Sequence, residues 1–235
     1  MYSFVVPWID PIDQYAKPPR LGDLPGGLDE WSGLVENDGD DAIVDGVAIR
    51  NRSIDATTYG ALALIDSELS GVGLVTDRQS SFAISGSTLV DCDLTGTRLR
   101  LLRSVAVKGS RLSGSDLSAG VFSDVVFEDC IFQYTNFRSS TFSRVSFAGC
   151  KLEEADFSGA KLTDLSFEGS QLMLVDLLDV FFERVDLRGA DSLTIASGGG
   201  LSGCLISDEQ VQELAYGLAL SAGASVERSV RPEQT

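Results

Sequence analysis

Residues 112–187 read LSGSDLSAGVFSDVVFEDCIFQYTNFRSSTFSRVSFAGCKLEEADFSGAKLTDLSFEGSQLMLVDLLDVFFERVDL. Every fifth residue from Leu112 to Leu187 is Leu or Phe, and the residue two places before each is small or β-branched, with Leu165 as the exception. A period of five matches neither the roughly 3.6 residues of a helical turn nor the two-residue alternation of a strand. Such a fixed internal period indicates a repeat protein.

The five-residue period requires two inward positions in each repeat, one large and one small, while the other three face solvent or turn a corner. Four repeats would close one coil of about twenty residues, and stacked coils would pair their backbones at the roughly 4.8 Å spacing of adjacent strands. Because one coil cannot bury its own core, the stability of such a solenoid comes from neighbouring coils. The sequence by itself leaves the number of sides open.

Close copies of one motif recur along the chain: ADFSG at residues 155–159, SDLSA at 115–119, TNFRS at 135–139 and CDLTG at 92–96. These copies resemble the pentapeptide-repeat family, whose consensus is A-(D/N)-L-X-X. The resemblance implies an all-β fold, a right-handed quadrilateral β-helix. Beyond the repeats we expect a C-terminal α-helix.

Three segments follow from the extent of the repeats. We expect a non-repeat N-terminal arm or cap over residues 1–41, the β-helix over residues 42–195, and a loop, a capping helix (residues 207–222) and a tail over residues 196–235. The arm holds five of the six prolines and both tryptophans. Its aromatic residues Trp8, Tyr15 and Trp31 are expected to pack over the first coil, because solenoid ends expose core and strand edges unless they are covered; a flexible tail is the alternative.

Two irregularities interrupt the repeats. Gln79 replaces an inward apolar residue, so a bulge or local loop is expected over residues 77–79. Leu99 and Val107 are eight residues apart rather than five or ten, so residues 100–106 must contain a short insertion or one shortened repeat centred on Leu102.

The C-terminal helix is predicted from Ser207, which can form a capping box with Gln210. Its apolar face would contain Val211, Leu214 and Leu218. This face could lie on the last coil or bridge two subunits. In relatives of known function the C-terminal end often makes a homodimer, so the resemblance supports the second arrangement.

Composition excludes several classes of function. The chain has no histidine and no metal-type cysteine spacing, and we expect no metal site, no cofactor and no catalysis. The net charge of −17 argues against direct binding of nucleic acid, whose phosphates need Lys and Arg. No apolar run is long enough for a membrane span and no secretory signal is evident, so we expect a cytoplasmic protein. Cys130 and Cys150, twenty residues apart, are interpreted as core fillers rather than a disulfide or metal pair.

If the coils are four-sided, four residues twenty apart form one column: Asp116, Asn136, Asp156 and Asp176. The column could be an anionic stripe that imitates a nucleic-acid backbone, or its side chains could shape turns, as Asx residues do. A basic cluster around the register slip, also a partner-binding candidate, contains Arg98, Arg100, Arg103, Lys108 and Arg111. Its alternative is a set of solvated charges that balance nearby acids.

A group of outward apolar residues near the C-terminal end contains Met173, Leu174, Leu178 and Phe181. Exposed apolar patches commonly mark contacts. The predicted helix could cover this group within one chain, or a second copy could contact it.

The resemblance implies a non-enzymatic binding protein. Some pentapeptide-repeat proteins are DNA mimics that bind DNA gyrase or topoisomerase IV, and they confer quinolone resistance or protect the host from its own gyrase poison. We therefore expect an acidic protein of this kind, with a type II topoisomerase as its partner and a homodimeric state. The alternative is a structural or scaffold protein with an unidentified protein partner.

Overall fold

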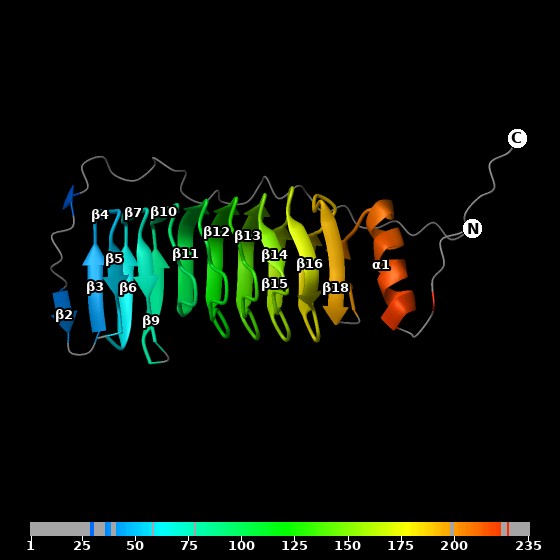
Figure 1. Cartoon of the computed structure of the whole chain (residues 1–235), viewed down its shortest axis with the longest axis horizontal. Helices are drawn as coiled ribbons and strands as arrows, with labels where there is room; N and C mark the ends of the chain where they lie inside the picture. Colours follow the sequence, from blue (N-terminus) through cyan, green and yellow to red (C-terminus); the bar gives the residue numbers. More distant parts are fainter. Residues whose placement is uncertain are drawn as a thin grey trace, which may run out of the picture.

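The computed structural model describes residues 29–30, 36–38, 41–57, 59–77, 79–197, 200–221 and 225. They form a β-solenoid whose strands stack side by side in sequence order along the long axis, with one helix at the far end (Figure 1). The predicted all-β repeat fold with a C-terminal helix is confirmed. In the described part of the chain, no helix has the length and hydropathy that crossing a membrane requires.

The strands belong to three sheets. The main path of the largest sheet is β1 (Asp29–Glu30), β4 (Val47–Arg50), β7 (Glu68–Ser70), β10 (Thr88–Val90), β11 (Leu99–Lys108), β12 (Val121–Glu128), β13 (Thr141–Ala148), β15 (Lys161–Ser166), β17 (Phe181–Asp186) and β19 (Cys204–Leu205). Its branch contains β2 (Glu36–Asp38), β3 (Asp41–Asp45), β6 (Ala61–Ile65) and β9 (Ser81–Ser85). The smaller sheets contain β14 (Lys151–Glu153), β16 (Gln171–Asp176) and β18 (Ser192–Ser197), and β5 (Ser53–Asp55) and β8 (Gly73–Val75). Every described pairing is parallel except that of β2 with β3.

Each regular coil has twenty residues and four sides. In the coil that starts near residue 130, the four inward residues Phe132, Phe137, Phe142 and Phe147 are fully buried. Phe142 pairs with residues twenty places before and after it, so identical positions of successive coils stack. One such buried column marks eight coils: Ile49, Leu69, Leu89, Val107, Phe127, Phe147, Phe167 and Leu187.

The corners are made by residues with left-handed backbone. In one coil, Asp124, Asp129, Tyr134 and Ser139 have φ values of 56°, 54°, 55° and 56°. At many corners the amide of the following residue closes a turn, as where Gly120 N–H donates to the Leu117 carbonyl at 3.2 Å. A positive φ at the third residue is what a type II turn requires. The period of five therefore sets one sharp turn after each inward residue.

Phenylalanine rings stack along the axis in the middle coils. The ring centroids of Phe127 and Phe147 are 5.0 Å apart with planes 17° from parallel, and those of Phe147 and Phe167 are 5.1 Å apart at 2°. These distances lie in the range where aromatic pairs attract beyond simple burial. The core of this segment is therefore a continuous aromatic column.

The register slip is a shortened repeat, and the alternative of an insertion is wrong. Ile84 pairs with Leu102, and Leu89 pairs with Val107, so each pair is 18 residues apart instead of twenty. Leu99 and Leu102 are both fully buried although only three residues separate them. The strand β11 runs through this side and joins two columns of the core.

The predicted local loop lies at residues 77–80. The Asp77 carboxylate accepts hydrogen bonds from the backbone N–H groups of Gln79 and Ser80, both at 2.8 Å. Gln79 is exposed, and Phe82 occupies the core instead and pairs with Leu99. This coil keeps twenty residues, so an Asx-type turn replaces one inward side chain without an insertion. Arg78 lies outside the described residues.

Both ends of the solenoid carry additional pairing. At the N-terminal end, β1 pairs with β4 and β2 pairs with β3, so these strands cover edges of the first coil. Trp8, Tyr15 and Trp31 lie outside the described residues.

At the other end is α1 (Asp208–Ser221). The predicted capping box is confirmed: Ser207 N–H donates to Gln210 Oε1 at 2.9 Å, and Gln210 N–H donates to Ser207 Oγ at 3.3 Å. The Gln210 side chain is 4% exposed and donates to the Leu187 carbonyl at 2.6 Å, and Leu214 packs on the core. Val211, predicted on the same apolar face, is instead exposed. The helix thus faces the last coil through Gln210 and Leu214, and the side chain of Leu218 is outside the described part.

Candidate partner-binding surface

The predicted column is formed in the structure. Parallel bridges join Asp116 to Asn136, Asn136 to Asp156, and Asp156 to Asp176. Because the coil closes after twenty residues, these side chains occupy one side of four successive coils. Arg98 precedes them in the same column, since the shortened coil places it beside Asp116.

The column side chains close local turns. The Asp116 Oδ1 accepts hydrogen bonds from Ser118 N–H at 3.1 Å and from Ser118 Oγ at 2.6 Å. Asp156 makes the same pair of contacts with Ser158, at 2.9 and 2.6 Å. Backbone N–H groups two residues ahead also donate to the side chains of Asn136 and Asp176. Of the two predicted roles, turn shaping is the one that these contacts describe.

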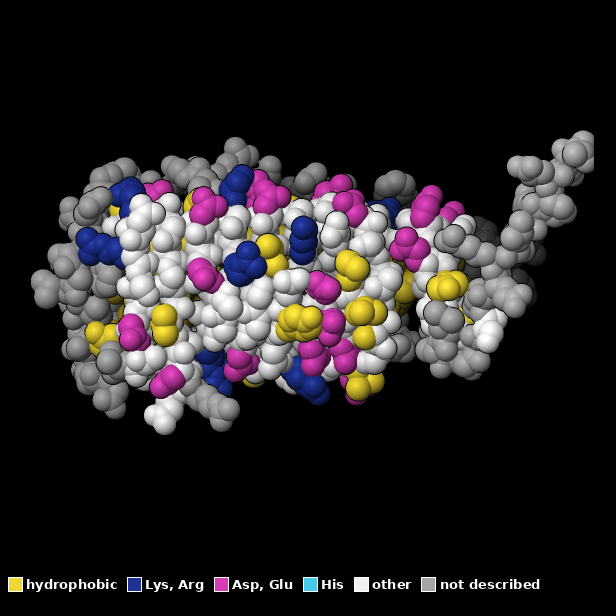
Figure 2. Space-filling model, in the orientation of Figure 1, with side chains coloured by type: hydrophobic (Ala, Val, Ile, Leu, Met, Phe, Trp, Pro, Cys, Tyr) yellow, Lys and Arg dark blue, Asp and Glu magenta, His cyan; other side chains and the backbone are white. Residues whose placement is uncertain are grey.

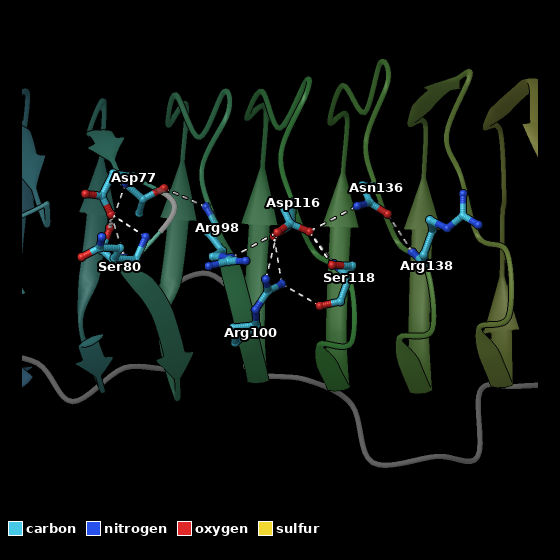
Figure 3. A network of polar contacts seen from close by, with 10 residues as sticks. Asp77, Ser80, Arg98, Arg100, Asp116, Ser118, Asn136 and Arg138 are labelled. Atoms are coloured by element: carbon cyan, nitrogen blue, oxygen red, sulfur yellow. Dashed lines mark hydrogen bonds and ion pairs between the residues drawn. The ribbon is translucent and has the colours of Figure 1, made fainter. Parts of the chain in front are cut away.

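Arginines neutralise part of the column. Arg98 Nε and Arg100 Nη2 lie 3.1 and 2.8 Å from Asp116 Oδ2 (Figure 3). Partial burial acts to raise the pKa of Asp116, but hydrogen bonds from Arg100 and Ser118 and the charge of Arg100 lower it to about 2. Arg138 Nη1 lies 2.9 Å from an oxygen of Asp156 in the next coil. The column therefore combines carboxylates, an amide and arginine side chains, and it is not a continuous row of unpaired negative charges. Its contact with a partner stays a prediction.

Two other basic residues of the cluster differ in whether they are paired with an acid. Lys108 Nζ pairs with Glu128 at 2.6 Å, whereas Arg103 is exposed and has no side-chain partner among the described residues. For Arg98, Arg100 and Lys108 the alternative of charges that balance nearby acids fits the observed contacts. Whether Arg100 or Arg103 binds a partner is still a prediction.

A second charged column was missed in the sequence. At one corner, residues twenty apart alternate in sign: Asp124, Arg144, Asp164 and Arg184. Arg144 holds Asp124 through two contacts of 2.6 and 2.7 Å, and Arg184 holds Asp164 through contacts of 2.5 and 3.0 Å. The hydrogen bonds that Arg144 donates to Asp124 raise the pKa of Arg144. In the sequence, the sign of the charge alternates every twenty residues and repeats every forty. This pattern can be recognised only once the coil length of twenty residues is known.

The inward cysteines lie in the core. Cys130 and Cys150 are fully buried and are not joined by a disulfide. Each thiol lies within hydrogen-bond range of backbone carbonyls, such as the Val107 carbonyl for Cys130 and the Phe127 carbonyl for Cys150. The neighbouring thiol of Cys130, together with burial, raises the pKa of Cys150. The described residues contain no group of side chains suited to a metal ion.

The outward apolar residues near the C-terminal end are not covered by α1. Met173, Leu174, Leu178 and Phe181 are all exposed, between 44 and 56%. The prediction that the helix caps this group is wrong, because α1 packs against the end of the last coil and not along its sides. The contact of these residues with a second copy stays a prediction.

Residues 101–177 match the family model described as pentapeptide repeat region. No curated protein matches the chain.

Three solved structures are similar at low identity. They are full-length QnrB1, a plasmid-mediated fluoroquinolone resistance protein (19% identity, 76% of this chain and 99% of that chain, TM-score 0.28), HetL from the cyanobacterium Nostoc (18%, 71% and 90%, TM-score 0.32) and Rfr23 from the cyanobacterium Cyanothece (14%, 72% and 92%, TM-score 0.20). The five-residue motif builds a four-sided coil, and residues 101–177 of this chain match a pentapeptide repeat region.

Proposed function

We propose that this protein is a non-enzymatic binding protein whose acidic rod occupies the basic DNA-binding groove of a type II topoisomerase, DNA gyrase or topoisomerase IV, and thereby changes the action of quinolones. The observation that carries the proposal is the distribution of paired and unpaired charge on the solenoid. The choice of enzyme comes from the pentapeptide-repeat proteins that the sequence resembles. QnrB1, one of the similar structures, is described as a fluoroquinolone resistance protein.

Most basic side chains of the solenoid are held by acids of their own or a neighbouring coil. Ion pairs of this kind are formed by Arg50, Arg98, Arg100, Lys108, Arg138, Arg144, Arg184 and Arg188. Several acids form no ion pair with another described residue: Asp45, Asp66, Asp91, Asp129, Glu154, Glu168, Asp179 and Asp191. The field far from the rod is therefore negative, and it attracts a basic surface.

The amount of charge limits how closely the rod imitates DNA. Residues 42–197 contain 21 acidic and 14 basic residues, a net of −7, and the remaining −10 of the total −17 lies in the two ends of the chain. Eight coils spaced by about 4.8 Å cover about 38 Å, a length over which B-DNA carries about 22 charges. We therefore expect weaker binding than that of DNA, with micromolar protein needed and a strong dependence on salt.

A supercoiling assay tests the proposal. With DNA gyrase and relaxed plasmid, micromolar protein should inhibit supercoiling or protect it from a quinolone, and the effect should decrease between about 50 and about 200 mM salt as charges are screened. Loss of any effect, together with no binding of gyrase in a pull-down with the purified proteins, contradicts the proposal.

The second candidate function is a scaffold with another protein partner. The exposed apolar residues near the C-terminal end favour it, since apolar patches commonly mark protein contacts. A pull-down from cell extract that repeatedly recovers one partner other than a topoisomerase, with no effect in the supercoiling assay, supports this candidate.

A homodimer through the C-terminal end is also proposed. It is supported by α1, which leaves Val211 exposed while Leu214 packs on the last coil. Light scattering on the full chain should give twice the monomer mass, and Val211→Ser should reduce it. A monomer mass for the unchanged protein contradicts this part of the proposal.

A further inference from the structure

One corner of the solenoid carries bulky residues where earlier coils have glycine. Gly96, Gly114, Tyr134, Glu154 and Leu174 occupy the same corner of successive coils, since the amide of each of the first four donates to a carbonyl at this corner of the next coil. All five have positive φ, between 51° and 67°. The two glycines show that this corner can be built without a side chain.

Tyrosine, glutamate and leucine are disfavoured in left-handed backbone, and bulky residues there are outliers. Left-handed backbone is imposed at corners throughout the solenoid, so what distinguishes this corner is the size and exposure of its side chains. Here the strained side chains project into solvent: Tyr134 is 61% and Leu174 51% exposed. Packing inside the chain therefore does not explain why this corner has large side chains.

Further exposed residues lie on the last coils next to this corner (Met173) and at the following corner of the same coil, where Leu178 and Asp179 come after Leu174 in the chain. We call the whole set the corner strip: Tyr134, Met173, Leu174 and Leu178, with the acids Glu154 and Asp179. Figure 2 shows hydrophobic side chains beside acidic ones on the coils that precede α1. Neither Glu154 nor Asp179 forms a side-chain hydrogen bond or ion pair with another described residue. The strip thus combines apolar surface with carboxylates that have no cation of their own.

We infer that the corner strip is a docking site for a basic amphipathic helix of a partner protein. Charge complementarity selects the partner, because the unpaired carboxylate of Glu154 lies between Tyr134 and Leu174 and that of Asp179 lies at the next corner, and both attract Lys or Arg. The spacing also fits. Tyr134 and Leu174 are two coils apart, about 10 Å at the spacing of adjacent strands, and two turns of a helix rise about 11 Å. Apolar residues at i, i+4 and i+7 of the helix would contact the strip, the spacing at which an amphipathic helix presents its apolar face.

This inference does not depend on a topoisomerase partner. The supercoiling assay and the peptide assay below have separate readouts, so failure of one leaves the other interpretable.

The probe is a fluorescein-labelled peptide of about five helical turns, built from Leu and Lys in amphipathic order. Two control peptides have the same composition in scrambled order, or Glu in place of every Lys. Fluorescence anisotropy with the full-length protein should show binding of the ordered peptide roughly tenfold or more tighter than either control.

Tyr134→Gly combined with Leu174→Gly is the decisive variant. It should weaken binding of the ordered peptide roughly tenfold or more, while its unfolding midpoint stays at or above that of the unchanged protein, because glycine relieves the strained φ. A structural role for the two side chains would instead lower the midpoint. Glu154→Gln combined with Asp179→Asn should weaken binding and reduce its salt dependence. Val121→Ser is the control, since Val121 is also an exposed apolar residue (44%) but lies on another side, and it should leave binding unchanged.

Two results would overturn the inference. One is equal binding of the ordered and scrambled peptides, which would mean attraction by charge alone. The other is a pair of observations: the unchanged protein does not bind the peptide, and the double glycine variant is a monomer in solution while the unchanged protein is a dimer. Together they would show that the strip contacts a second copy of this chain.

Discussion

Replacing Phe147 by leucine measures how much the aromatic column contributes to stability. The Phe147 ring contacts four other rings in the core: Phe127 at 5.0 Å, Phe132 at 5.5 Å, Phe142 at 6.2 Å and Phe167 at 5.1 Å between centroids. Two of these contacts, with Phe127 and Phe167, are stacked along the solenoid axis. Leucine keeps the site apolar but removes all four ring contacts.

The magnitude follows from the number of ring contacts. Each favourable aromatic pair contributes about 0.5–1.5 kcal/mol beyond its buried area, so the two stacked contacts alone amount to about 1–3 kcal/mol. The loss of side-chain volume from Phe to Leu adds about 1 kcal/mol in a core that repacks in part. We therefore expect Phe147→Leu to lower the free energy of unfolding by about 2–4 kcal/mol.

Two other core phenylalanines provide the controls. Phe82 is also fully buried but makes no ring contact with another described aromatic residue, and Phe122 contacts one ring, that of Phe142, at 4.8 Å. Phe82→Leu should cost about 1 kcal/mol, and Phe122→Leu should lie between the two. Urea denaturation followed by circular dichroism gives the three values, with a constant denaturant slope as the test of cooperative unfolding. Equal costs for Phe147→Leu and Phe82→Leu would refute the reasoning that ring contacts stabilise the column.

Three further predictions concern the corners and the charges. Gly114→Ala should cost about 1 kcal/mol through its positive φ alone. Gly203→Ala should cost at least about 1 kcal/mol more, because its β-carbon would overlap the backbone carbonyl of Phe182, which cannot rotate away; equal costs in urea denaturation contradict this. Arg184→Met leaves the Asp164 carboxylate, which is only 5% exposed, without its partner and should lower the free energy of unfolding by about 2–3 kcal/mol. Arg138→Met removes the partner of Asp156 at an exposed ion pair and should lower it by less than about 1 kcal/mol. A larger effect of Arg138→Met than of Arg184→Met would contradict this. Asp116 has a folded pKa of about 2, below the unfolded value of about 3.9, so its stabilising contribution is complete above about pH 4 and is lost as the pH falls to about 2; the difference in unfolding free energy between the unchanged protein and Asp116→Asn should shrink over that window, and a constant difference would contradict it.

Much of the fold could be predicted because the five-residue period states which side chains point inward. Leu112 and Phe137 are buried as that period requires, and the capping box of Ser207 with Gln210 is a local signal that the structure confirms. The break at Leu102 was also detectable, since a change of phase needs no tertiary information. These features depend on residues close together in the sequence.

The candidate surface was less predictable because its contacts join residues about twenty places apart. That Arg100 neutralises Asp116 depends on the 18-residue coil, and that Arg184 holds Asp164 depends on a regular coil of twenty. The orientation of α1 was mispredicted in part, since an amphipathic pattern does not say that Gln210 would reach the carbonyl groups of the last coil while Val211 faces solvent.

The chain sequence alone determined the inward columns and the C-terminal helix, because each depends on local periodicity and local hydrogen bonding. Only the tertiary structure decided which charges neutralise each other, and that the apolar residues around Leu174 remain exposed. The physical reason is that the length of a coil determines which residue of the next coil lies beside a given residue. A coil that is two residues shorter therefore changes which side chains of the adjacent coils lie side by side.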